Sequence, residues 1–177
     1  MRTELRYVDP TRPPGLLVRA YSAVGATRFA RFISRHVNWK LDPLLLRLSR
    51  GRLASTLVIP SALLETRGAR SGAIRRNAVI YFHDRGRPTI AASNAGAPRH
   101  PAWFHNLRAD PDVVLGGIPM RASVVTDPAE LDRLWPLADR VFPGFATYRR
   151  DAAAVNRTIP MVQFDAIDHG VEERRTT

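Results

Sequence analysis

Strand-length segments follow one another along the middle of this chain with only a short turn between them. The segments are rich in β-branched and aromatic residues, and glycine-containing turns such as Arg67–Gly72 and Asp84–Pro88 separate them. Turns this short join antiparallel neighbours, because a parallel pair needs a crossover of about a dozen residues or more. Six strands are expected, at residues 62–66, 74–83, 89–93, 113–117, 120–126 and 158–167. The chain is therefore expected to form a mainly antiparallel sheet.

Helices are expected beside these strands, over residues 101–108, 128–142 and 146–156. Six strands with helices at the periphery are typical of a small β-barrel. The sequence lacks both the alternation of strands and helices and the Gly-x-Gly-x-x-Gly turn of a Rossmann fold. We expect an α+β domain, mainly antiparallel β, over residues 41–170, followed by a tail at 171–177.

Residues 1–40 are expected to form an N-terminal extension to this domain. Residues 1–14 contain prolines that stop a helix, and they are expected to form a strapping arm or a disordered tail. Residues 16–38 have an amphipathic helical pattern with a basic stripe made of Arg28, Arg31 and Arg35. The stripe has two open interpretations, which are docking on anionic lipid and simple exposure to solvent on a helix packed against its own domain. A second short helix is expected between Asp42 and Gly51.

The composition excludes several classes of site. The chain has no cysteine, so disulfides, thiolate nucleophiles and iron–sulfur clusters are ruled out, and its five histidines do not have the spacing of a metal motif. No metal site is therefore expected. No apolar run approaches the roughly 20 residues that span a bilayer, and no signal peptide is visible at the N-terminus. We expect a cytoplasmic protein, and the arginine stripe leaves open a peripheral position on the inner face of the membrane.

The positive charge of the chain is concentrated in its front part. The net charge is +11, with +8 on residues 1–60, +6 on residues 61–108 and −3 on residues 109–177. A basic front and an acidic rear favour an anionic partner, such as a phosphate-bearing cofactor, an acidic membrane or nucleic acid. Nucleic acid is not expected, because the sequence has no helix-turn-helix and no aromatic RNA-binding motif.

The densest basic cluster in the barrel lies at a glycine turn. The turn Gly68–Gly72 is followed directly by Arg75, Arg76 and Asn77. Glycines let the backbone approach an anion, and the exposed N–H groups, Ser71 and the forked guanidinium groups are all donors to phosphate oxygens. The sequence indicates an anion-binding rim, with an ordinary solvated hairpin as the open alternative.

A second cluster, over residues 93–107, combines a small-residue loop with the start of a helix. Helix N-termini attract anions, while Trp103 and Phe104 offer flat apolar surface beside the polar tips of His105 and Asn106. A planar, phosphate-bearing cofactor requires stacking surface next to anion donors. The alternative is that Trp103 and Leu107, four residues apart, face the core.

These motifs together resemble the deazaflavin-dependent nitroreductase family. The resemblance is carried by Gly-Ala-Arg-Ser-Gly at 68–72, by Ala-Pro-Arg-His-Pro-Ala-Trp-Phe-His-Asn-Leu at 97–107 and by Arg-Thr-Ile-Pro at 157–160. It implies a split β-barrel of the FMN-binding type that binds coenzyme F420, with FMN less favoured. Where the family often has Ser-Lys-Gly-Gly, this chain has Ser93-Asn94-Ala95-Gly96.

The resemblance also implies where the cofactor lies. A basic groove for the phosphate and polyglutamate tail maps onto Ala69, Arg70, Arg75 and Asn77. The further expected cofactor contacts in this segment are Ser71, Arg76, Ala78 and Val79. The deazaflavin ring maps onto Ala91, Ala92, Ser93, Asn94, Ala102, Trp103, Phe104, His105 and Asn106. The family's substrate lid maps onto Phe142, Phe145 and Tyr148.

The leading hypothesis is therefore an F420H2-dependent oxidoreductase. It would pass a hydride to a small apolar acceptor such as a quinone, an unsaturated compound or a nitro compound. Tyr148 and Ser93 are the candidate catalytic proton donors. The alternative is a non-catalytic or weakly catalytic binder of a lipid, fatty acid, quinone or cofactor at the membrane surface. A homodimer is a possible assembly of such a barrel.

Overall fold

The computed structural model describes residues 5–12, 15 and 59–167. The expected helices at 16–38 and 42–51, together with the tail at 171–177, lie outside the described residues. In the described part of the chain, no helix is long and apolar enough to cross a bilayer.

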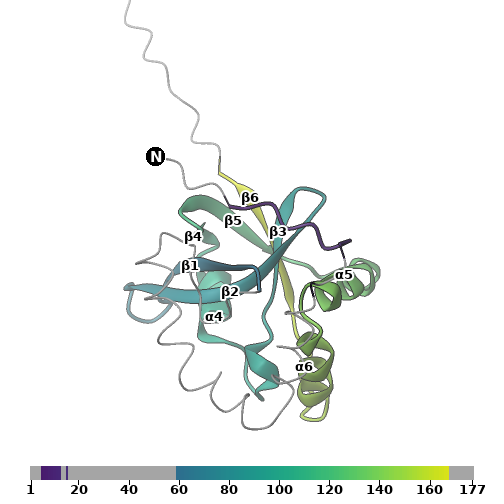
Figure 1. The fold of residues 1–177 in the computed structure, drawn as a ribbon. Coiled ribbons are helices and arrows are strands. Elements are labelled where there is room, and N and C mark those ends of the chain that lie inside the picture. The colour runs from purple at the N-terminus through teal and green to yellow at the C-terminus, as the bar shows by residue number, and fades with distance from the viewer. Residues whose placement is uncertain (1–4, 13–14, 16–58, 168–177) are drawn as a thin grey trace, which may run out of the picture.

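Six strands of the described chain close into one antiparallel barrel (Figure 1). They are β1 (Ser61–Arg67), β2 (Ile74–Asp84), β3 (Arg87–Ala91), β4 (Asp112–Leu115), β5 (Ile118–Val124) and β6 (Met161–Ala166). The remaining elements are the short helix η2 (Asn94–Gly96) and the helices α4 (Ala102–Ala109), α5 (Pro128–Val141) and α6 (Gly144–Ala153). All six expected strands and all three expected helices are therefore confirmed, with ends shifted by a few residues.

The strand order departs from the chain order at one point. β1, β2 and β3 form a meander, but β3 then pairs with β6, through Ile90 and Val162, instead of with β4. β4 pairs back onto β1, where Leu64 lies opposite Leu115. The chain leaves the sheet after β3 to form η2 and α4, so the neighbouring position beside β3 stays open for the last strand.

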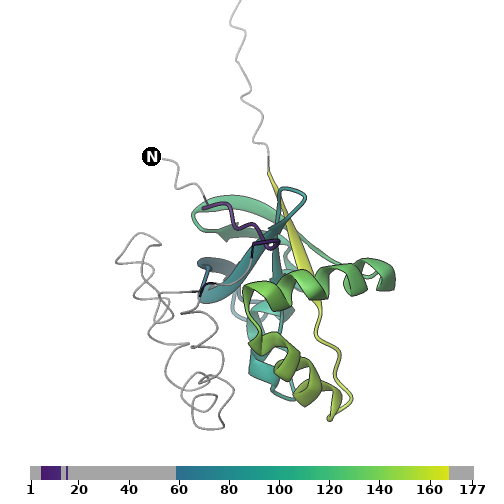
Figure 2. The ribbon, with the colours of Figure 1, turned by 45° about the vertical axis from the view of Figure 1, so that its right-hand side comes forward.

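Two apolar cores hold the fold together. The first fills the barrel, with Leu64, Leu115 and Phe164 fully buried, and it includes Trp103 and Leu107 from α4. The second lies between the barrel wall and α5 and α6, which lie together on one side of the barrel (Figure 2). Burial of a large apolar side chain stabilises a fold by roughly 1.5–3 kcal/mol. The helices are thus as much a part of the core as the strands are.

An ion pair fastens α5 to the barrel. Asp127 caps the helix by accepting a hydrogen bond from the N–H of Ala129 at 3.1 Å. One turn further on, Arg133 donates two hydrogen bonds to the buried carboxylate of Asp84 at the end of β2, at 2.8 and 2.6 Å. Bidentate, partly desolvated pairs of this kind fix orientation as well as contributing energy.

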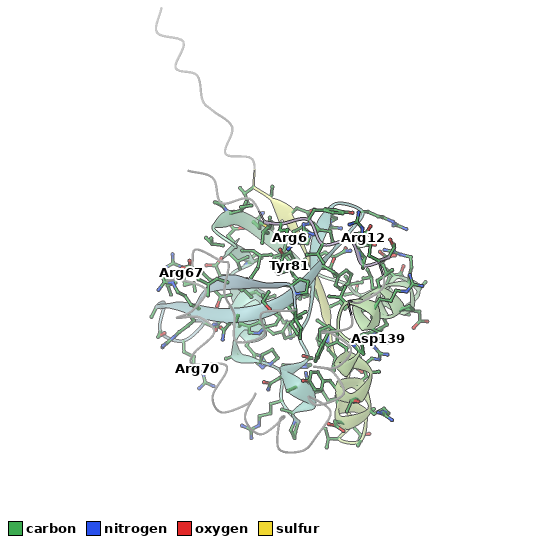
Figure 3. All side chains as sticks on the ribbon, in the orientation of Figure 1. Arg6, Arg12, Arg67, Arg70, Tyr81 and Asp139 are labelled. Atoms are coloured by element: carbon green, nitrogen blue, oxygen red, sulfur yellow. The ribbon has the colours of Figure 1, made fainter. Side chains whose placement is uncertain are left out.

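The described part of the N-terminal arm straps across β2. The backbone of Val8 and His83 exchange two bonds, with Val8 N–H donating to His83 Nδ1 at 3.0 Å and His83 N–H donating to the Val8 carbonyl at 2.9 Å. The Tyr81 hydroxyl donates to the carbonyl of Arg6 at 2.8 Å, and the two residues lie side by side in Figure 3. Residues 6 and 8 of the arm are thus hydrogen-bonded to β2.

Candidate functional site

The turn between β1 and β2 is built tightly around its glycines. Gly68 N–H donates to the Ala73 carbonyl and Gly72 N–H to the Gly68 carbonyl, both at 2.8 Å. A side chain on Gly68 would bring its Cβ to 2.8 Å from Ser71 Oγ, and Gly72 has a φ of +68°, which favours glycine. The turn therefore has a defined shape that depends on both glycines.

The arginines of this turn differ in how they are paired. Arg76 forms an ion pair of 3.0 Å with Glu65, its cross-strand neighbour, so it is less available to an anion than the sequence alone indicated. Arg75 makes a long hydrogen bond of 3.4 Å to Ser71 Oγ. Arg70 and Arg75 are exposed, and within the described residues neither forms an ion pair with a carboxylate. The rim residues that have no carboxylate partner in the described chain are thus Arg70, Ser71 and Arg75.

Asn106 connects the turn to α4. Its Oδ1 accepts a hydrogen bond from the N–H of Ala69 at 3.1 Å, and its Nδ2 donates to Thr66 Oγ1 at 3.0 Å. Asn106 is 9% exposed and Thr66 is 1% exposed, so the bond between their side chains is buried, while the bond from the exposed residue Ala69 is partly buried. The two clusters picked out in the sequence are therefore physically joined, and Ala69 N–H is already used within the protein.

The faces of α4 separate core contacts from exposed groups. Trp103, Phe104 and Leu107 are buried, while Ala102 and His105 are exposed. Both Trp103 and Leu107 thus face the core, as the alternative interpretation stated. Pro101 caps the helix with no side-chain hydrogen bond, so within the described residues no side chain caps the first N–H groups of α4.

The loop after β3 has an unusual backbone. Asn94, Ala95 and Gly96 have φ values of 48°, 49° and 72°, three left-handed residues in a row. A side chain on Gly96 would meet Asp151 Cβ at 2.9 Å and the backbone of Tyr148 at 3.2 Å, so this glycine permits close packing on α6. Ala95 bears a side chain in a conformation that costs roughly 1–2 kcal/mol for a residue other than glycine.

Arg157 holds this loop from inside, and sequence reasoning gave it no role beyond the Arg-Thr-Ile-Pro resemblance. Its Nη2 donates to the carbonyls of Ala92 at 2.7 Å and Ser93 at 3.0 Å, and its Nη1 donates to the carbonyl of Ala97. The side chain is only 8% exposed, and burial lowers its pKa. A buried arginine surrounded by carbonyls is visible only once the fold brings segments some 60 residues apart together.

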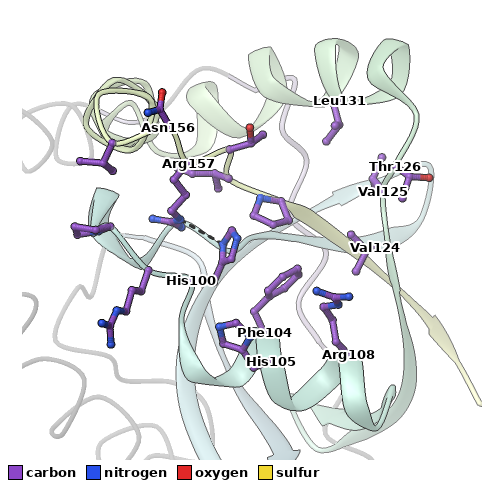
Figure 4. Close-up of a pocket in the computed structure, with 16 residues that line it drawn as sticks. His100, Phe104, His105, Arg108, Val124, Val125, Thr126, Leu131, Asn156 and Arg157 are labelled. Atoms are coloured by element: carbon purple, nitrogen blue, oxygen red, sulfur yellow. Dashed lines mark hydrogen bonds between the residues drawn. The ribbon is translucent and has the colours of Figure 1, made fainter.

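A pocket of about 870 Å³ opens beside α4 (Figure 4). Its apolar walls come from Phe104 of α4, Val124 at the end of β5, Leu131 of α5 and Ile159 ahead of β6. Figure 4 shows His100, Phe104 and Arg108 directed into the space between α4 and α5. Among the expected cofactor residues, Phe104 and His105 line this pocket.

His100 is one of two histidines that line the pocket. Arg157 Nε donates to His100 Nδ1 at 3.3 Å, which leaves the ring proton on Nε2 in the neutral form. Burial lowers the pKa of His100 below its ordinary value, and the nearby cations Arg157, His105 and Arg108 lower it further. The ring is therefore held as a neutral hydrogen-bond donor near physiological pH.

The expected lid residues lie elsewhere. Phe142, Phe145 and Tyr148 are buried in the second core, with ring centroids 5.2 Å apart for the two phenylalanines and 5.8 Å apart for Phe142 and Tyr148. None of the three lines the pocket beside α4. Ser93, by contrast, is half-buried, and within the described chain its hydroxyl forms no hydrogen bond.

The remaining expected contacts are mostly buried or partly buried strand residues. Asn77 and Ala78 are half-buried on β2, Asn94 is exposed, and Val79, Ala91 and Ala92 are buried, with Ala92 fully so. Contact from the last three would have to come through the backbone. In the described part of the chain, no group of three or more histidine or acidic side chains is arranged to hold a metal ion.

Comparison with known proteins connects the chain to a family of reductases. A family model described as F420H(2)-dependent quinone reductase matches residues 44–165. An F420H(2)-dependent quinone reductase of Mycobacterium tuberculosis is 32% identical over 143 residues, which cover 75% of this chain and 95% of that protein.

Two solved structures share the fold. One, described as an F420-H2 dependent reductase (FDR-A), has a TM-score of 0.52 and 29% identity over 60% of this chain and 94% of its own. The other, described as a domain-swapped dimer, has a TM-score of 0.53 and 27% identity over 67% of this chain and 92% of its own. The expected split-barrel class is confirmed by these likenesses and by the closed six-stranded barrel.

Proposed function

The chain belongs to the F420H(2)-dependent quinone reductase family, and from this premise we propose that it transfers a hydride from reduced coenzyme F420 to a small apolar acceptor such as a quinone. The observation that carries the proposal is the family match over residues 44–165, which contains every residue mapped onto the cofactor. It spans the turn, the loop and α4, the three parts that hydrogen bonds of Asn106 and Arg157 hold in place.

The residues present fit an anionic deazaflavin. Coenzyme F420 bears a phosphate and glutamate carboxylates, and the exposed Arg70 and Arg75 stand beside Ser71 without carboxylate partners in the described chain. Guanidinium groups bind such oxygens through paired, charge-assisted hydrogen bonds. The uncapped first turn of α4 adds N–H donors with a favourable dipole. The donor set is thus cationic where the cofactor is anionic.

On this proposal, the chain binds and orients while the bound deazaflavin supplies the hydride. Arg70, Ser71 and Arg75 hold the tail. The backbone of residues 91–94 and the start of α4 position the ring, and the left-handed loop keeps that backbone in one shape. Holding cofactor and acceptor in a fixed orientation speeds the transfer, because the reaction no longer depends on a random bimolecular encounter.

Ser93 and Tyr148 are the proposed proton donors to the reduced acceptor. Ser93 is half-buried, and its hydroxyl makes no hydrogen bond within the described residues, which supports it as a donor. Tyr148 is 9% exposed and packs on Phe142, so its participation requires α6 to shift when the acceptor binds. Replacing each by alanine or phenylalanine and comparing kcat for menaquinone reduction separates the two.

The oligomeric state and the membrane association of the chain each have one supporting observation. A solved relative is described as a domain-swapped dimer, and we infer that this chain also forms a homodimer. Light scattering of the full chain measures its mass directly. Peripheral association through Arg28, Arg31 and Arg35 is tested by flotation with anionic liposomes, which fails in the triple glutamate variant if the stripe docks.

Titration of the full chain with F420 and with FMN, followed by cofactor fluorescence, tests the proposed function. We expect F420 to bind at micromolar concentration or tighter and FMN to bind more weakly. Arg75→Ala removes a charge-assisted hydrogen bond worth about 1.5–3 kcal/mol, which weakens F420 binding roughly 10- to 150-fold. Arg121→Ala is the control for loss of a surface arginine, because Arg121 is exposed but already paired with Asp112.

Absence of F420 binding at micromolar concentration would overturn the reductase proposal. Equal affinities of the Arg75→Ala and Arg121→Ala variants would reject the groove while leaving the reductase activity itself to be judged by turnover of F420H2 with menaquinone.

A further inference from the structure

The pocket beside α4 has an unbalanced charge. Its lining contains Arg99, Arg108 and Arg157 together with two histidines, and no aspartate or glutamate. Elsewhere in the described chain, most arginines lie within 4.0 Å of a carboxylate, as Arg67, Arg76, Arg87, Arg121, Arg133 and Arg149 do. Arg99 and Arg108 form no such pair within the described residues.

The buried cation strengthens this imbalance. Arg157 is 8% exposed and satisfies its donors with three carbonyls and the ring of His100. Carbonyl dipoles satisfy the hydrogen bonds but leave the full positive charge in place. A buried charge is stabilised by an ionic partner, and an anion in the adjoining pocket would provide one.

The rest of the pocket is apolar. Phe104, Val124, Leu131 and Ile159 form its walls, and the exposed side chain of Val155 lies at its edge. A volume of about 870 Å³ falls in the usual range for small-molecule sites. His100, whose Nδ1 accepts from Arg157, has Nε2–H left for a ligand oxygen. The wall thus suits an apolar body, and the donors suit an oxygen anion.

We propose that this pocket is a second ligand site, which takes a small amphipathic anion made of an apolar body and one anionic oxygen group. Arg108 and His100 bind the oxygen anion, and the apolar walls bind the body. The site is separate from the F420 groove, because none of residues 68–94 lines it and only Phe104 and His105 are shared with the residues mapped onto the cofactor.

Two fluorescent probes that differ by one anionic group test this proposal on the full chain without F420. 8-Anilinonaphthalene-1-sulfonate carries a sulfonate, and N-phenyl-1-naphthylamine is the same aromatic amine without it. We expect the sulfonate probe to bind about tenfold more tightly or better, because its oxygens gain charge-assisted hydrogen bonds. Equal affinities would overturn the proposal.

A charge-matched pair of variants locates the anion. Arg108→Gln should weaken binding of the sulfonate probe about tenfold and leave the neutral probe unchanged. Arg140→Gln makes the same change in net charge at an exposed arginine of α5 that does not line the pocket, and it should change neither affinity. Equal behaviour of the two variants would reject Arg108 as the anchor and with it the site.

Imidazole NMR signals distinguish this pocket from adventitious binding elsewhere. The sulfonate probe should shift the signals of His100 and His105, while His83, bonded to Val8 on another part of the barrel, stays unshifted. A shift of His83 without His100 would overturn the assignment. Saturating F420 should leave probe binding intact, and competitive displacement by F420 would assign the pocket to the cofactor and defeat the claim of a second site.

Discussion

Asn106 Oδ1 accepts a hydrogen bond from the N–H of Ala69 at 3.1 Å, so a helix that follows the third strand holds the turn between the first two. The same side chain donates to Thr66 Oγ1 at 3.0 Å. Two segments that the sequence presents as separate motifs therefore form one unit, and a ligand bound at either is linked to the other by a single buried amide.

Replacing Asn106 by alanine should destabilise the fold and loosen the turn. The change leaves the buried Thr66 Oγ1 without its partner, which costs about 1–3 kcal/mol, and it frees the partly buried Ala69 N–H. Urea denaturation measures the loss, and hydrogen exchange should speed up at residues 68–72. His105→Ala, at the adjacent exposed position of α4, serves as the control, and an equal loss in both variants would contradict the bridging role of Asn106.

Ala95 and Gly96 should respond in opposite directions to exchange of a methyl group. Ala95→Gly relieves a left-handed residue and should stabilise the protein by about 0.5–1 kcal/mol, after the entropy of glycine offsets part of the gain. Gly96→Ala introduces the same strain and a contact of 2.9 Å with Asp151 Cβ, and it should destabilise by about 1–3 kcal/mol. Thermal unfolding measures the change in stability of each variant. Changes of the same sign in the two variants would refute the left-handed backbone of this loop.

Arg157→Lys should fail to replace arginine although it keeps the charge. A single ammonium group cannot reach the carbonyls of Ala92, Ser93 and Ala97 together as the planar guanidinium does. We expect a loss of about 1–3 kcal/mol in unfolding free energy for unpaired carbonyls. Faster hydrogen exchange in residues 92–97, with strand amides unchanged, is the specific sign.

Arg150→Lys is the control for that substitution, because Arg150 is exposed on α6 and its side chain bonds only to Thr147 Oγ1 in the described chain. If Arg157→Lys were as stable as the unmodified protein, the loop would require only a positive charge at this position and not the several N–H donors of a guanidinium group.

Stability should fall as the solution is acidified through the histidine range. Burial lowers the pKa of His83 below its ordinary value of 6.5, and that of His100 is also lowered. The unfolded chain therefore takes up protons first as the pH drops below about 6.5, so unfolding becomes easier until the folded histidines also protonate. Protonation of His83 Nδ1 also removes the acceptor of the Val8 N–H.

Urea unfolding between pH 7.5 and pH 5 measures this dependence. His83→Asn retains an acceptor that does not titrate, so the variant should show a shallower fall and should keep the Val8 amide protected at pH 5. An unchanged pH profile in the variant would exclude His83 as a source of the effect.

Local pattern was sufficient for the elements of the fold. Three of these elements depend only on neighbouring residues in the chain, and all three are present in the structure. They are the strand with alternating apolar residues at 74–83, the turn at 84–88 and the start of α5 at Asp127-Pro128. Placement of β6 between β3 and β5 was not predictable in this way. It depends on which strand edge remains uncovered after η2 and α4 leave the sheet.

The candidate site also has features that follow from local sequence and features that depend on the fold. The glycines and exposed arginines of the turn follow from sequence, because turn chemistry and charge density are local properties. The pairing of Arg76 with Glu65 depends on strand register, which moves every side chain to the other face if it slips by one residue. Nothing in the local pattern indicates that Arg76 has a carboxylate partner and that Arg75 has none in the described chain.

The sequence by itself determined an Arg-rich antiparallel barrel, a glycine turn with basic neighbours, and the motifs of a deazaflavin-binding family. Only the tertiary structure decided that Asn106 joins the turn to α4, that Arg157 supports the loop and that His100 and Arg108 face a pocket. Hydrogen bonds and charge pairs between residues 37 to 65 positions apart depend on how the barrel closes, and short-range periodicity contains no information about that closure.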